Sequence, residues 1–195
     1  MQGTLDEVIG SFKANVEKKP VMWMELVTRE LAVLINVSVE QAGQVYLVGR
    51  VIPALDALIT GLLYTKTDEL TVEVISRTLN LLAKLSRDQQ GALAIAQSKN
   101  IVLRALLYFN RGVFPAEYVL QSLRLLNNCI KTVPDFRGIF LDTHGFTLKG
   151  LDKCVSDTLD LFNESLQKGD WDNFTNACSF VSGLSDAFPE RAIDF

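Results

Sequence analysis

The stretch Ser38-Val-Glu-Gln-Ala-Gly-Gln-Val45 returns 48 positions later as Ser86-Arg-Asp-Gln-Gln-Gly-Ala-Leu93. Both copies follow the pattern Ser-x-acidic-Gln-x-Gly-x-apolar. A third copy, Asp135-Phe-Arg-Gly-Ile-Phe140, keeps the acidic residue, the glycine and an apolar residue 47 positions further on, and residues 189–195 echo it again. Similarity at a fixed period of roughly 40–50 residues is typical of helical repeat proteins. The sequence therefore predicts an array of stacked repeats.

Two further motifs recur in step with the first. One is a short Leu-x-Ala/Gly-Leu motif, and the other is a segment with apolar residues at helical spacing that precedes each copy of the first motif. The short motif spans residues 55–58, 103–106 and 148–151, and the apolar segment spans residues 31–37, 79–85 and 123–129. Three motifs that recur in one order predict that each repeat contains the same succession of helices.

Local patterns predict an all-α chain. Thr4, Ser38 and Ser86 each stand three residues before a glutamate or glutamine, which is the pattern of a helix-capping box. Apolar periodicity and turn residues then place the helices. The expected long helices span residues 4–18, 21–36, 51–64, 69–86, 101–110, 115–131, 147–167 and 171–187, and short helices span residues 39–48, 87–97 and 135–141.

Two stretches resemble the armadillo family. Gly49-Arg-Val-Ile-Pro-Ala-Leu55 is similar to the armadillo pattern in which a glycine turn leads into Ile-Pro-x-Leu, and Leu125-Leu-Asn-Asn-Cys129 resembles the third-helix pattern with Asn128 at the asparagine position. The resemblance covers roughly residues 21–195. It implies a right-handed α-solenoid of about four armadillo-like repeats, with the helices of residues 4–36 as a cap or partial repeat.

The sequence also departs from the armadillo pattern. Lys84 and Gly183 replace the asparagine in two copies, and Ser98-Lys-Asn100 replaces the glycine turn in one. The array is therefore expected to be irregular, as in armadillo-like and HEAT-like proteins. We read residues 1–195 as one repeat domain. Because residues 188–195 resemble the start of another repeat, we expect either a piece of a longer array or an atypical cap at that end.

Composition narrows the class of protein. Hydrophobic residues make up 48% of the 195 residues and charged residues 22%, so the chain can bury a core. The net charge of −4 disfavours nucleic-acid binding, which needs a basic surface. Three cysteines without a Cys-x-x-Cys pair favour a reducing compartment, so we expect a cytoplasmic protein, or a nuclear one. No signal peptide and no stretch of about 20 apolar residues is visible, so no membrane insertion is expected.

The resemblance implies that the third helices line a concave surface that binds an extended segment of a partner protein. Their exposed row falls at positions i, i+3 and i+7, and it holds four cations and no carboxylate. Amide and guanidinium groups can hydrogen-bond a peptide backbone, and the cations favour an acidic or phosphorylated partner. The predicted partner-binding residues are Arg29, Asn36, Arg77, Asn80, Lys84, Gln121, Arg124, Asn128 and Asn176.

Other interpretations remain open. The row can consist simply of solvated helix positions. The chain can instead be an oligomerisation or cytoskeleton-associated module that docks through its ends or convex face. It can also be an armadillo-type cofactor that grips a folded chaperone or GTPase domain. Trp23 and Trp171, near the two ends, are candidate contact residues, although aromatic residues there are also expected to cap the core.

An enzyme is not expected. His144 is the only histidine, and with Cys129, Cys154 and Cys178 it forms no zinc-site spacing. The cysteines occupy apolar helical positions, where a thiol behaves as a small buried side chain. No nucleophile elbow, phosphate-binding loop or dinucleotide fingerprint occurs. We therefore predict no catalytic, metal-binding or cofactor-binding residues.

Overall fold

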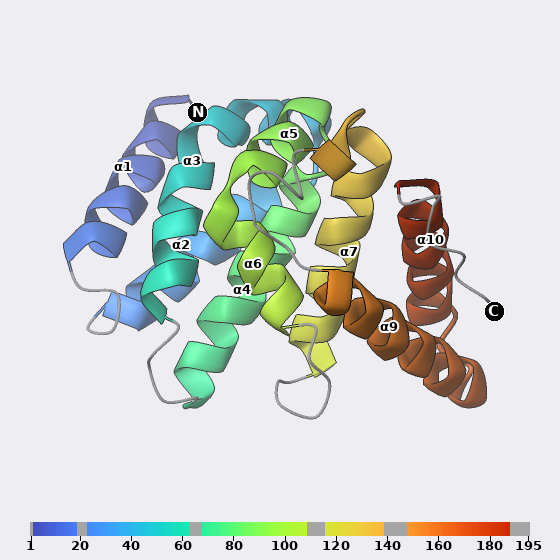
Figure 1. Ribbon diagram of the computed structural model, residues 1–195. Helices are drawn as coiled ribbons and strands as arrows, with labels where there is room; N and C mark the ends of the chain where they lie inside the picture. The colour runs from blue at the N-terminus through green and yellow to red at the C-terminus, as the bar shows by residue number, and fades with distance from the viewer. Residues whose placement is uncertain (1, 19–22, 63–67, 109–115, 139–147, 188–195) are drawn as a thin grey trace.

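The computed structural model describes residues 2–18, 23–62, 68–108, 116–138 and 148–187 (Figure 1). Every regular element in these ranges is a helix and none is a strand, which confirms the expected all-α class. The helices are α1 (Gln2–Lys18), α2 (Met24–Val37), α3 (Gln41–Gly61), α4 (Glu69–Leu85), α5 (Gln89–Gln97), α6 (Lys99–Tyr108), α7 (Ala116–Thr132), α9 (Leu148–Lys168) and α10 (Trp171–Ala187).

Four helices that are distant in sequence form one row. α2 packs on α4, α4 on α7, and α7 on α10, so each helix contacts the next one along the row. These are the segments that the sequence marks as the third helix of each repeat. A second series runs beside the row, in which α1 packs on α3 and α3 on α6. Figure 1 shows the helices following one another across the molecule from the blue N-terminal end to the red C-terminal end.

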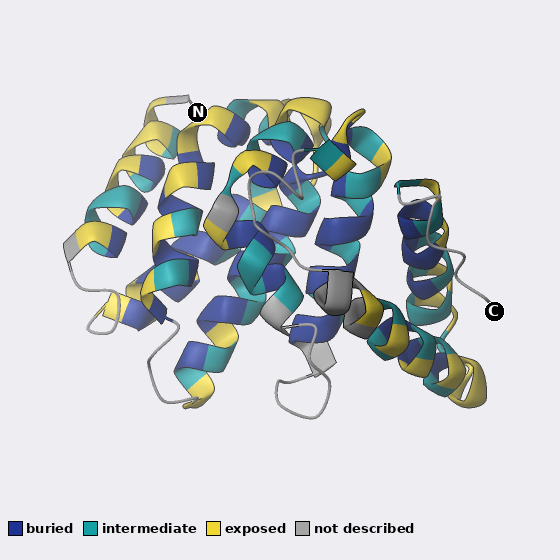
Figure 2. Cartoon of the chain, in the orientation of Figure 1, coloured by how far each residue is buried: buried dark blue, intermediate teal, exposed yellow. Residues whose placement is uncertain are grey.

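One hydrophobic core connects the helices. Its buried side chains form a single cluster that runs from Ile9 in α1 to Leu184 in α10. Figure 2 shows the buried faces of neighbouring helices turned toward one another and the exposed faces turned outward. Leu31, Leu79 and Leu123, which the sequence motifs align, are each fully buried in α2, α4 and α7. The recurring motif therefore marks recurring core positions.

The recurring glycine has a steric cause. A Cβ atom at Gly43 would lie 1.9 Å from the carbonyl oxygen of Val37, and one at Gly91 would lie 2.1 Å from that of Leu85. In both copies the first turn of a helix crosses closely over the last carbonyl of the preceding helix. Only glycine leaves room for that crossing, so Gly43 and Gly91 perform the same structural task.

The expected capping boxes are wrong. α1 begins before Thr4, at Gln2. Ser38 and Ser86 stand at the C-terminal ends of α2 and α4, where each hydroxyl donates to a carbonyl three residues earlier. The cap of α5 is Asp88, whose carboxylate accepts from the Gln90 and Gly91 N–H groups. Neither serine stands at the N-cap of the next helix, because Glu40 occupies that position in α3 and Asp88 occupies it in α5.

The expected glycine turn at Gly49 is also absent, because α3 continues unbroken from Gln41 to Gly61 with Pro53 inside it. Buried Leu47, Val51 and Leu55 keep the helical spacing across the supposed turn. Gly49 and Pro53 both lie on the exposed face. The carbonyl that loses its N–H partner to proline therefore faces water, which can satisfy it.

This continuous helix changes one sequence expectation. Of the described helices, α3 alone is long and apolar enough by length and composition to cross a membrane. Half of its most apolar window is buried within the fold. The sequence prediction missed it because it divided these residues between two helices.

A tight turn positions the last helix. Gly169 adopts φ 67°, and the N–H groups of Gly169 and Asp170 donate to the Leu166 and Ser165 carbonyls, which is the Schellman arrangement at a helix end. The Asp170 carboxylate then accepts from the Asn173 N–H at 3.1 Å and caps α10. The first turn of α10 is thereby held beside α7, with Asp172 in it.

Candidate functional site

A hollow of about 350 Å³ lies between α4, α7 and α10. It is at the middle and end of the four-helix row rather than along the whole of it. Six of the nine predicted partner-binding residues line it, together with three residues that were not predicted. The lining consists of Asn80, Ala83, Lys84, Arg87, Gln121, Arg124, Asn128, Asp172 and Asn176.

The hollow is basic, although the chain as a whole is acidic. Lys84, Arg87 and Arg124 supply three cations and Asp172 one carboxylate. Lys84 lies in the last turn of α4 and Arg87 just after it, where positive charge also complements the helix dipole. No ion pair joins Lys84 or Arg87 to another residue of the described ranges.

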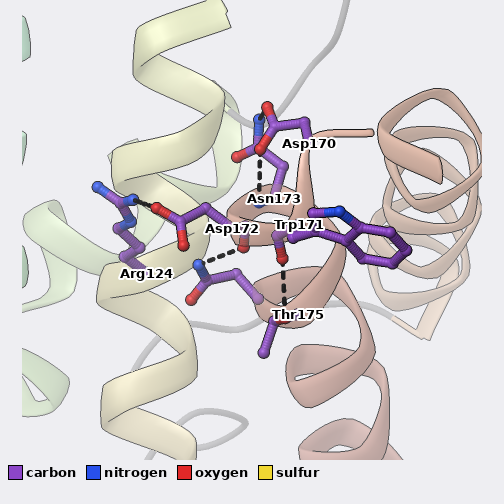
Figure 3. A network of polar contacts seen from close by, with 7 residues as sticks. Arg124, Asp170, Trp171, Asp172, Asn173 and Thr175 are labelled. Carbon is purple, nitrogen blue, oxygen red and sulfur yellow. Dashed lines mark hydrogen bonds and ion pairs between the residues drawn. The ribbon is translucent and has the colours of Figure 1, made fainter. Parts of the chain in front are cut away.

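Among the three cations of the hollow, Arg124 alone forms an ion pair within the part of the chain that the structure describes. Its Nη2 lies 3.5 Å from Oδ2 of Asp172, across the gap between α7 and α10 (Figure 3). The Arg124 side chain is 33% exposed and that of Asp172 is 87% exposed. Solvent screens such a pair, so it contributes little to stability, roughly 0–1 kcal/mol.

Two of the predicted amide groups already serve the fold. The Asn128 side chain donates to the Ala83 carbonyl at 3.0 Å and to the Ser86 hydroxyl at 2.9 Å, which satisfies the C-terminal end of α4. The Asn176 amide donates to the Asp172 carbonyl at 2.7 Å within α10. Both N–H groups of the Asn128 side chain are thus engaged by the end of α4, although the residue lines the hollow.

Three predicted residues lie outside the lining of the hollow. Arg29 and Asn36 are exposed on α2, the first helix of the row. Arg77 donates to the Thr28 carbonyl on α2 at 3.3 Å and pairs with Glu73 at 2.6 Å. Arg77 thus joins α4 to α2, so its charge is already engaged.

One position of the row that was predicted to be exposed is buried in α10. Gly183, which stands at the asparagine position of the last copy and hence in the row, is buried, and a Cβ atom there would lie 2.6 Å from Ile130 Cγ2 of α7. The row at i, i+3 and i+7 therefore partly faces the neighbouring helix instead of solvent.

Arg87 and Asp172 are the functional candidates that the sequence prediction missed. Arg87 follows Ser86 at the end of α4, and it falls in the short helix that was expected at residues 87–97. Asp172 lies 48 positions from Arg124 along the chain, so only the stacking of α10 on α7 brings the two together. The acidic first turn of α10 was the one local signal that a carboxylate would stand at this end of the row.

The exposed aromatic residues at the ends lie apart from the hollow. Trp23 is 43% exposed and Trp171 is 66% exposed, so neither is buried as a core cap. The Trp171 ring packs edge-on against Phe174, which in turn packs on Phe162 of α9. Figure 3 shows Trp171 pointing away from Arg124.

The residues considered for catalysis do not converge in the described ranges. Burial raises the pKa of the Cys129 thiol to about 12, so it stays protonated. Cys178 is half-buried on α10. His144 and the side chain of Cys154 lie outside the described residues. Within the described ranges no three His, Cys, Asp or Glu side chains gather into a group that could hold a metal ion.

No protein-family model, no curated protein and no solved structure matches this chain.

Proposed function

We propose that this protein is a binding scaffold that takes an extended, acidic segment of a partner protein into the hollow between α4, α7 and α10. We further propose that its helices form an armadillo-like solenoid of about four repeats and that it acts in the cytoplasm. The observation that carries the binding proposal is the basic hollow in an acidic chain, lined by Lys84, Arg87 and Arg124. Complementary charge guides association and selects partners.

The size and lining of the hollow favour a segment over a folded domain. A volume of about 350 Å³ holds a few side chains. Asn80 and Gln121 add amide groups that can bond the backbone of an extended chain. The packing of α2, α4, α7 and α10 in one row supports the same proposal, because helical repeats that stack in this way create extended binding surfaces.

The proposal is tested with a fluorescein-labelled peptide of twelve glutamates, with a glutamine peptide of equal length as the uncharged probe. Fluorescence anisotropy at low salt should show binding of the acidic peptide only. The double variant Lys84→Gln/Arg87→Gln should weaken binding by about tenfold, because it removes two of three cations. The matched control Lys13→Gln/Lys168→Gln removes the same charge from α1 and α9 and should bind like the wild type.

Two results would contradict the proposal. One is equal loss in the hollow and control variants, which would mean that only net charge matters. The other is no binding of the acidic peptide at any accessible concentration. A phosphoserine peptide of equal charge, tested beside the glutamate peptide, shows whether the hollow prefers phosphate or carboxylate groups.

A second candidate function, self-association through the α2 end of the row, rests on a different observation. In α4 and α7, Arg77 and Asn128 reach back to the preceding helix of the row. The apolar residues on the same face of each of these helices are fully buried, namely Val74 and Leu81 in α4 and Tyr118 and Leu125 in α7. The corresponding residues of α2 are Leu26 and Val33, which are 37% and 43% exposed.

The exposed α2 stripe thus has the pattern of a helix-packing face. A second copy could cover it by packing α2 against α2 around a twofold axis. Light scattering after size exclusion tests this: the wild type should form a dimer at high micromolar concentration, and Leu26→Glu/Val33→Glu should be monomeric. A monomeric wild type with an unchanged variant would remove this candidate.

A further inference from the structure

The carboxylate of Asp172 indicates how an acidic ligand would enter the hollow. It stands beside Arg124 at the edge of the hollow, and the dashed line in Figure 3 marks their ion pair. An acidic ligand in the hollow therefore meets three cations in two different states. Lys84 and Arg87 have no ion-pair partner in the described ranges, whereas Arg124 already faces the Asp172 carboxylate. The charge of the third cation is already shared with Asp172, so an acidic ligand competes with Asp172 for Arg124.

Displacing Asp172 requires little rearrangement. Its side chain is 87% exposed, so it can turn into solvent by a change of rotamer. The backbone of α10 stays in place, because Asp170 caps the helix and the Asn176 amide holds the Asp172 carbonyl. The pair with Arg124 is a weak, solvent-screened one.

We propose that Asp172 is an internal competitor at this site: an acidic side chain of the bound segment takes its place on Arg124, and Asp172 thereby lowers the affinity of the hollow for acidic ligands. This inference rests on the proposed function and adds to it a residue that sets affinity. It also assigns roles within the hollow. Lys84 and Arg87 attract the ligand, and Arg124 exchanges one carboxylate for another.

The test compares Asp172→Asn with Asp186→Asn, using the labelled glutamate peptide. Both aspartates are exposed on α10 and both substitutions remove one negative charge, but Asp186 lies near the far end of the helix, away from Arg124. Asp172→Asn should tighten binding about two- to fivefold, which is the range of an exposed ion pair. Asp186→Asn should leave the affinity unchanged, and thermal melts should show both variants folded.

A double-mutant cycle with Arg124→Gln separates competition from a general effect of charge. If Asp172 acts through Arg124, the gain from Asp172→Asn disappears when Arg124 is already replaced. Equal gains from the two aspartate variants, or a gain that survives Arg124→Gln, would overturn the inference.

The proposed function and the competitor role fail in different ways. If the wild type binds the glutamate peptide through Lys84 and Arg87 while Asp172→Asn has no effect, the competitor role alone is refuted. If neither the wild type nor Asp172→Asn binds the peptide, both proposals fall.

Discussion

The crossing of α5 over the end of α4 makes a sharp prediction about Gly91. A Cβ atom there would lie 2.1 Å from the Leu85 carbonyl oxygen, 2.9 Å from the Leu85 carbonyl carbon and 3.1 Å from Val48 Cγ2. Two of these three atoms are backbone, so a side-chain rotation cannot relieve the contact. α5 would have to move away from α4 by roughly 1 Å in a close-packed interior.

The expected cost of Gly91→Ala follows from two opposing effects. Overpacking a core costs about 1–3 kcal/mol. Replacing glycine by alanine stabilises a helix by at most about 1 kcal/mol, and by less in the first turn, where Gly91 lies. We therefore expect a net loss of about 1–2 kcal/mol, which lowers the melting temperature by roughly 2–8 °C in a chain of this length.

Gly49→Ala is the matched control. Gly49 lies inside α3 on its exposed face, and a Cβ atom there would meet nothing within 4 Å. With the same chemical change and no clash, the helix should gain about 0.5–1 kcal/mol. Thermal unfolding followed by circular dichroism at 222 nm measures both variants.

The decisive result is that Gly91→Ala lowers the melting temperature whereas Gly49→Ala raises it. If Gly91→Ala is as stable as the wild type, or if both substitutions shift the melting temperature in the same direction, the steric explanation of the repeated glycine is wrong. Gly43→Ala should repeat the result of Gly91→Ala, because its Cβ would lie 1.9 Å from the Val37 carbonyl oxygen.

Three further side chains make separate predictions. Asn128→Ala should lower the free energy of unfolding in urea by about 2 kcal/mol, because two hydrogen bonds to the end of α4 are lost. The control Asn36→Ala, at an exposed position, should change that free energy by less than about 0.5 kcal/mol. Similar values for the two variants would contradict a capping role of Asn128. Ser11→Ala removes a 2.5 Å hydrogen bond from α1 to buried Glu30 of α2, so amide hydrogen exchange in α1 should become faster. Unchanged exchange in α1 would show that the Ser11–Glu30 hydrogen bond does not hold α1 on α2. A variant in which the other two cysteines are replaced by serine isolates Cys129. Its thiol should not react with a thiol reagent at pH 8 until the protein unfolds, because burial raises its pKa to about 12. Rapid labelling of the folded protein would refute the burial of Cys129.

Local sequence patterns anticipated the helices well, because helices depend on interactions within a few residues. Apolar spacing placed α4 and α10 close to their observed bounds. It would also have revealed α3 as one helix, since the stripe through Leu47, Val51 and Leu55 runs without a break. The resemblance to an armadillo glycine turn led the prediction away from that periodicity at Gly49.

The candidate site was only partly predictable. Exposure along a helix face follows from its period, so most of the hollow's lining was found. Whether an exposed-looking polar residue is free depends on the neighbouring helix. Asn128 and Arg77 each donate to a carbonyl of the preceding helix in the row, and no spacing within α7 or α4 predicts those contacts.

The sequence by itself determined the all-α class, the approximate positions of most helices and the recurrence of a leucine and a glycine at intervals of 44 to 48 residues. These features depend on spacing along one chain segment. Only the tertiary structure decided that α4, α7 and α10 share a basic hollow and that Asp172 stands beside Arg124. Those partners come from different helices, and their distances depend on how the helices stack, which no local pattern specifies.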